Sequence, residues 1–100
     1  GKTYEKQPQE KASKLEWKEQ KELESKRRKL KKEFEIAEKR ISELEDLISG
    51  IDEEMSDPAT GTDPIKLSAL SKERSEADDE LSSLLERWEE LFLLIEDVSS

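Results

Sequence analysis

Residues 30–55 read LKKEFEIAEKRISELEDLISGIDEEM, and their apolar side chains recur at alternating intervals of four and three residues. A second series with the same spacing runs from Leu67 to Val98. A mean interval of about three and a half residues keeps one narrow stripe of a helix facing a partner helix over many turns. We refer to these two stripes as the seam. Its members are Leu30, Phe34, Ala37, Ile41, Leu44, Ile48, Ile51 and Met55, then Leu67, Leu70, Arg74, Ala77, Leu81, Leu84, Trp88, Leu91, Ile95 and Val98.

A stretch with two prolines and a glycine separates the two series. The ring of Pro58 drives the preceding residue out of the helical conformation, so the first helix should end there. Asp63 followed by Pro64 is typical of an N-cap and the first residue of a new helix. Two helices joined by so short a turn predict an all-α fold, an antiparallel two-helix coiled-coil hairpin.

The start of the first helix is predicted from Ser13-Lys14-Leu15-Glu16, which matches a capping box. Before it the chain is polar, contains a proline and lacks periodicity. The predicted boundaries are a partly disordered linker over residues 1–12 and a hairpin over 13–100, with helices at about 13–56 and 64–98 and a turn at 57–63.

Side-chain volume predicts which residues of the seam face each other. Both small seam residues meet a large one if Ala37 faces Trp88 and Ile48 faces Ala77. The same alignment pairs Met55 with Leu70, Phe34 with Leu91 and Leu30 with Ile95. It also places Arg74 near Ile51, with its guanidinium reaching solvent or Asp52. Nothing in the second helix should then reach Leu15, Trp17 or Leu23.

Composition excludes several kinds of site. The chain has 31% hydrophobic and 45% charged residues, which suits a long helix pair better than a globular core. It contains no Cys and no His, so thiolate and imidazole chemistry is excluded. Its longest apolar run, residues 91–95, is far shorter than a membrane span. We therefore expect a cytoplasmic chain, and the first residue, Gly1, is typical of a piece cut from a longer protein.

Charge is distributed unevenly. Residues 1–32 hold 12 Lys or Arg and 6 Asp or Glu, whereas the remainder holds 6 basic and 21 acidic residues. The densest cluster, residues 26–32, could neutralise several phosphates. The alternative is a solvated helix face offset by neighbouring glutamates. The candidate nucleic-acid-binding residues are Lys14, Lys18, Lys21, Lys26, Arg27, Arg28, Lys29, Lys31 and Lys32.

Acidic pairs such as Glu53-Glu54 and Asp78-Asp79 do not predict a catalytic or metal site, because adjacent residues on a helix point in different directions. No catalytic, metal or cofactor-binding residue is predicted in this chain. Apolar side chains outside the seam instead favour packing against a further segment or a second copy. They are Leu85, Phe92, Leu93 and Leu94.

Two segments resemble a known family. Lys14-Leu15-Glu16-Trp17-Lys18-Glu19-Gln20-Lys21-Glu22-Leu23-Glu24 resembles the start of the C-terminal domain of Uup-type ABC-F ATPases. Leu85-Glu86-Arg87-Trp88-Glu89-Glu90-Leu91 resembles its closing segment. The similarity covers about residues 14–97 and includes the heptads and the acidic-proline turn.

The resemblance implies a cytoplasmic protein with two ATP-binding cassettes, which would bind ATP and Mg, followed by this hairpin. Such proteins act on the ribosome, and the Uup-type C-terminal domain is associated with DNA binding. We therefore expect a non-catalytic accessory domain, a monomer or weak homo-oligomer, that contacts DNA or ribosomal RNA through the basic start of its first helix. The alternative is a purely structural or protein-interaction coiled coil.

Overall fold

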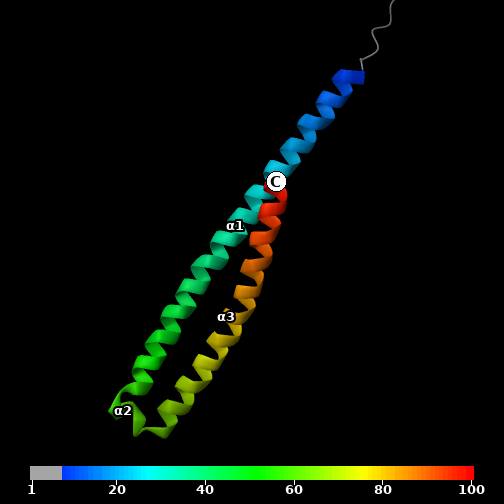
Figure 1. Ribbon diagram of the computed structural model, residues 1–100. Coiled ribbons are helices and arrows are strands. Elements are labelled where there is room, and N and C mark those ends of the chain that lie inside the picture. The colour runs from blue at the N-terminus through cyan, green and yellow to red at the C-terminus, as the bar shows by residue number, and fades with distance from the viewer. Residues whose placement is uncertain (1–7) are drawn as a thin grey trace, which may run out of the picture.

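The computed structural model describes residues 8–100, with side chains from residue 11 onward, and shows an all-α hairpin. Helix α1 spans Pro8–Ser56, the short helix α2 spans Pro58–Gly61, and α3 spans Pro64–Ser99. The long helices α1 and α3 lie side by side and antiparallel, joined at one end by α2 (Figure 1). The predicted fold class is therefore confirmed. No helix in the described part of the chain has a stretch apolar and long enough to span a bilayer.

Helix α1 begins at Pro8, five residues before the capping-box residue Ser13 at which the sequence predicted its start. Proline is tolerated in the first turn, where its missing N–H would have no helical partner, and the following Gln, Glu, Lys and Ala favour helix. Residues 8–12, predicted as part of a linker, are therefore helical. The rest of that predicted linker, residues 1–7, lies outside the described residues.

The tip contains a helical turn that the sequence interpretation missed. Asp57 leaves the helical conformation, as predicted, and its carboxylate accepts a hydrogen bond from the Ala59 amide at 3.0 Å. Asp63 caps α3 in the same way, accepting from the Lys66 amide at 3.1 Å. Each aspartate precedes a proline at the first helical position, so the signal that restarts α3 also forms α2.

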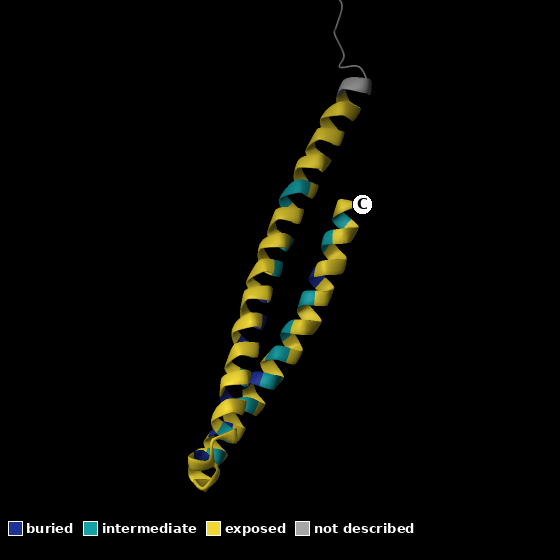
Figure 2. Cartoon of the chain, turned by 60° about the vertical axis from the view of Figure 1, so that its left-hand side comes forward, coloured by how far each residue is buried: buried dark blue, intermediate teal, exposed yellow. Residues whose placement is uncertain are grey.

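The seam forms the core of the hairpin. Every residue of the two heptad series is buried or half-buried, and the buried positions face inward between α1 and α3 (Figure 2). Leu44 and Leu91 are the most enclosed, each with 1% of its surface exposed. Burial in so thin a core follows from the 3.5-residue repeat, since only two positions per heptad face the partner helix.

Contacts between α1 and α3 agree with the predicted alignment. The centre of the Phe34 ring lies 5.3 Å from that of Trp88 and 6.4 Å from that of Phe92. Trp88 and Phe92 flank Leu91, the predicted partner of Phe34, in the sequence of α3. Trp88 donates a hydrogen bond to Glu38, the residue after Ala37, at 3.2 Å. Phe34 and Glu38, which lie on either side of Ala37 in α1, thus both contact Trp88, as expected if Ala37 faces it.

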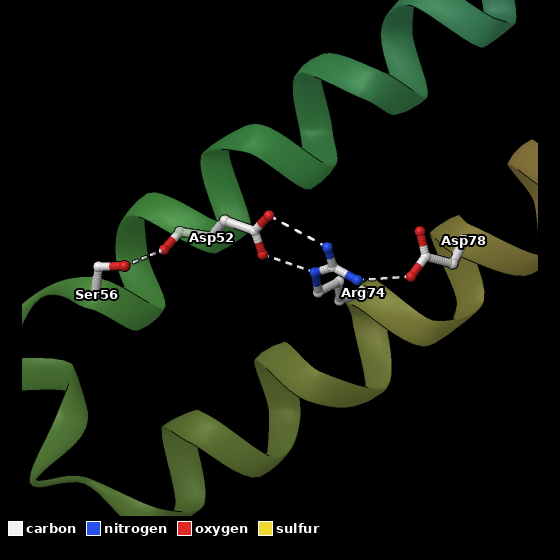
Figure 3. A network of polar contacts seen from close by, with 4 residues as sticks. All are labelled: Asp52, Ser56, Arg74 and Asp78. Atoms are coloured by element: carbon white, nitrogen blue, oxygen red, sulfur yellow. Dashed lines mark hydrogen bonds and ion pairs between the residues drawn. The ribbon is translucent and has the colours of Figure 1, made fainter.

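Arg74 lies where the alignment predicted it. Its guanidinium donates two hydrogen bonds to Asp52 across the seam, at 2.6 and 3.2 Å, and one to Asp78 in its own helix, at 2.6 Å (Figure 3). The Ser56 hydroxyl in turn donates to the backbone carbonyl of Asp52 at 2.9 Å. The only polar member of the two seam series is therefore half-buried by its stem and held by two carboxylates.

Replacing Arg74 with leucine is expected to raise the free energy of unfolding by about 1 kcal/mol. An apolar side chain on the seam gains more from burial than the exposed ion pairs supply. Thermal unfolding followed by circular dichroism measures the change, and Arg40→Leu is the control because Arg40 pairs with Glu80 across the helices from outside the seam. We also expect Arg74→Leu to associate more readily, since polar seam residues limit alternative pairings. Lower stability with unchanged sedimentation would contradict this assignment of Arg74.

Candidate nucleic-acid interface

Helix α1 carries all nine candidate residues and extends beyond the end of α3. The last residues of α3, Val98 and Ser99, line a groove with Gln20, Leu23 and Arg27 of α1. From there α1 continues alone toward its N-terminus (Figure 1). We call residues 11–32 the base, as distinct from the tip around α2.

The exposed start of the base agrees largely with the prediction. Leu15 and Trp17 are exposed, and both precede the residues of α1 that line the groove with the end of α3. Leu23 differs from the prediction, because it lines that groove although it remains largely exposed. The difference arises because Ser99 and Ser100, which follow the predicted helix end at about residue 98, also line this groove.

All candidate basic residues are exposed, but they divide between two sides of the base. Lys32 lies two residues from both Leu30 and Phe34, which is about 160° around the helix from each. Lys32 therefore faces directly away from the seam. Intervals of three, four and seven residues keep four more cations on this side. We call this set the basic stripe: Lys14, Lys18, Lys21, Arg28 and Lys32.

The other candidates lie off the stripe. Arg27 continues the seam spacing and lines the groove with the end of α3. Lys26 and Lys31 flank it on the two sides of the seam, and Lys29 lies between the seam and the basic stripe. The predicted cluster at residues 26–32 is thus not one surface, and only two of its six cations face away from the partner helix.

Sequence reasoning missed Lys39, which is exposed and follows Lys32 by seven residues. The same helical repeat that aligns the basic stripe was the available signal. Lys39 is the cation of this side of α1 that lies nearest the tip. Glu35 and Glu43 lie about one helical turn from it in either direction. We therefore treat Lys39 as an extension of the basic stripe toward the tip.

The three arginines of residues 33–100 form ion pairs between the helices. Arg40 pairs with Glu80 at 2.6 Å, Arg74 with Asp52, and Arg87 with Glu33 at 3.2 Å. Hydrogen bonding to Arg74 lowers the pKa of Asp52 from its ordinary value. Hydrogen bonding to Arg40 lowers the pKa of Glu80 in the same way. All three pairs join α1 to α3, so their arginines are already engaged by carboxylates.

The cations of the residue 26–32 cluster are not engaged in this way. Within residues 11–100, no ion pair involves any of them. Lys21 has an aromatic neighbour, since its ammonium lies 5.6 Å from the centre of the Trp17 ring. The base therefore presents cationic groups to solvent, whereas the arginines of residues 33–100 pair with carboxylates and hold the helices together.

The tip has the opposite character. A groove beside it is lined by Asp52, Glu53, Asp57 and Asp78, whose carboxylates would repel phosphate. In the described residues, no three acidic side chains form a group that could hold a metal ion. The arrangement offers one surface for a polyanion, the base, and an acidic surface at the other end of the rod.

Comparison with known proteins identifies one family. The family model of the ABC transporter C-terminal domain matches residues 25–92. This range contains most of the paired helices, the tip and the residue 26–32 cluster, but not Lys14, Lys18 or Lys21. No curated protein and no solved structure matches the chain.

Proposed function

The chain belongs to the ABC transporter C-terminal domain family and is an accessory domain of an ABC protein, and we propose that it contacts nucleic acid through the basic stripe. The target is DNA or ribosomal RNA. The proposal further places the domain in a cytoplasmic ABC-F ATPase of the Uup type, whose cassettes bind ATP and Mg. The observation that carries the proposal is a row of exposed cations on the outer side of α1, which begins at Lys14 and Lys18 before the groove with the end of α3 and continues to Lys32.

The length of the rod supports this function despite the net charge of −9. Helix α1 has 49 residues, which corresponds to roughly 74 Å. The screening length at physiological ionic strength is about 8 Å, so the acidic tip has little influence on the field at the base. A polyanion approaching the base therefore meets mainly the local charge of residues 11–32, which hold 10 Lys or Arg and 4 Glu, and not the average charge of the chain.

The dimensions of the basic stripe fit a nucleic-acid backbone. Lys14 and Lys32 are eighteen residues apart, or roughly 27 Å along the helix. Phosphates in one DNA strand are spaced by about 3.4 Å along the helix axis, so the stripe can meet several of them. Such contacts release counterions, so binding should be weak at physiological salt and should strengthen steeply as salt is lowered.

The proposal is tested by comparing two charge-reversal variants that change the net charge equally. Arg28→Glu with Lys32→Glu removes two cations from the basic stripe, and Lys66→Glu with Lys72→Glu removes two near the tip. We expect the first pair to abolish binding of labelled duplex DNA and ribosomal RNA at low salt, and the second to leave it almost unchanged. Fluorescence anisotropy at two salt concentrations measures both affinity and its salt dependence.

A second candidate function, protein interaction or a purely structural role, has its own observation. Leu85, Phe92, Leu93 and Leu94 remain exposed on α3 although the seam is closed. The titration separates the two functions. Salt-independent binding, the absence of binding at low salt, or equal loss in both variants would favour the second candidate.

A further inference from the structure

We propose that Trp17 is a stacking platform for an unpaired nucleobase. Residues 11–32 of α1 would then bind single-stranded nucleic acid in preference to duplex. The inference rests on the proposed function, because it concerns the same surface, and it names the class of nucleic acid that this surface selects. The indole is 66% exposed, and Trp17 precedes the residues of α1 that line the groove with the end of α3. Tryptophan is enriched at interfaces, because its ring is largely apolar and its N–H can still be hydrogen-bonded.

Trp17 has a lysine one helical turn away on each side, and Glu24 lies two turns along the same face. Lys14 precedes Trp17 by three residues and Lys21 follows it by four, so both lie on the same side of the helix as the indole. Lys18 is the next residue in the chain, about 100° further around the helix. The Lys21 ammonium lies 5.6 Å from the centre of the indole ring. An aromatic ring edged by the basic stripe combines the two groups that bind a flexible strand, a π-face for a base and cations for phosphates.

Apolar neighbours that would indicate a protein partner lie elsewhere. Leu15 is about 160° and Leu23 about 120° around the helix from Trp17. The three exposed apolar residues of the base therefore form no common stripe, as a helix docking onto another protein would require. Trp17 lies away from apolar side chains and next to lysines. A nucleobase therefore matches its ring better than an apolar groove on a protein does.

The preference for single strands follows from what a ring can reach. In a duplex both faces of each base are covered by its neighbours in the stack, so an indole on a straight helix gains no face to contact. An unpaired base can turn its face to the indole while its phosphates lie along the basic stripe. Stacking on aromatic side chains tolerates any sequence, because every base has a π-face. The structure thus leads us to expect selection by strandedness and not by sequence.

The test uses a Trp88→Phe background, so that Trp17 is the only tryptophan and its fluorescence reports on its own surroundings. The probes are a 15-nucleotide mixed-sequence DNA strand and the same sequence as a duplex, titrated at low salt. We compare Trp17 with Trp17→Phe and Trp17→Leu, using labelled DNA for affinity. Thermal unfolding checks that the hairpin is intact in all three, as expected for a residue that α3 does not contact.

We expect single-strand binding to quench the Trp17 emission and duplex binding to leave it nearly unchanged. Trp17→Leu should weaken single-strand binding by about tenfold, within the range for loss of a stacking residue. It should not change duplex affinity, and Trp17→Phe should keep most of the single-strand affinity. Binding of both probes without quenching, or an equal loss for both in Trp17→Leu, would overturn the stacking role and leave the proposed function standing. Failure of the unmutated domain to bind either probe or ribosomal RNA at low salt would overturn both.

Discussion

Replacement of Leu91 by alanine is expected to lower the free energy of unfolding by about 2–5 kcal/mol, a large part of the total for a small domain. Leu91 has only 1% of its surface exposed and faces the α1 seam near Phe34. Removing three carbon atoms there costs both their transfer from water and the cavity left behind, because two long helices cannot collapse locally around the gap.

Leu93→Ala is the matched control for this prediction. Leu93 lies two residues further along the same helix and is 60% exposed. Both substitutions change helix propensity equally, so the difference between them isolates burial. Denaturation by urea followed by circular dichroism measures both, and Leu93→Ala should stay within about 0.5 kcal/mol of the parent. Equal losses in the two variants would show that the hairpin does not depend on its seam.

Ala37→Leu is expected to destabilise the hairpin by about 1–3 kcal/mol, through overpacking. Ala37 is 5% exposed, and the neighbouring Glu38 accepts a hydrogen bond from Trp88. A leucine at this position has to displace the indole, which also stacks with Phe34 and Phe92. Several contacts would therefore change together, and near-ultraviolet circular dichroism should show an altered tryptophan signal.

Ala69→Leu serves as the comparison for Ala37→Leu, because Ala69 is exposed within α3. The added leucine atoms there meet solvent, so its free energy of unfolding should change by no more than about 0.5 kcal/mol. If Ala37→Leu proves as stable as Ala69→Leu, there is room beside Trp88 and the argument from side-chain volume fails.

The basic stripe and the residue 26–32 cluster differ in how their cations are distributed around α1. Residues 26–32 are conspicuous because six cations occur in seven positions. On a helix, however, seven consecutive residues cover the whole circumference, and Arg27 falls on the seam side. The more continuous surface comes from cations three, four or seven residues apart, such as Lys14, Lys18 and Lys21, which are less conspicuous in the linear sequence.

The sequence alone determined which residues form the seam and where the helices meet at the tip. The 3.5-residue repeat assigns the inward positions, and the two Asp-Pro pairs stop and restart the backbone. Both signals act over a few residues, so they can be read without knowing the partner helix. The volume argument extended this to the pairing of Ala37 with the region of Trp88 and to the contact of Arg74 with Asp52.

Only the tertiary structure decided which charges are neutralised and how far α3 reaches along α1. Arg40 and Arg87 bind carboxylates forty or more residues away in the chain, so their partners depend on the exact alignment of the helices. The helical end of α3 at Ser99 brings it beside Leu23 and leaves Trp17 uncovered. That alignment is set by the summed packing of many side chains from both helices, which no local pattern contains.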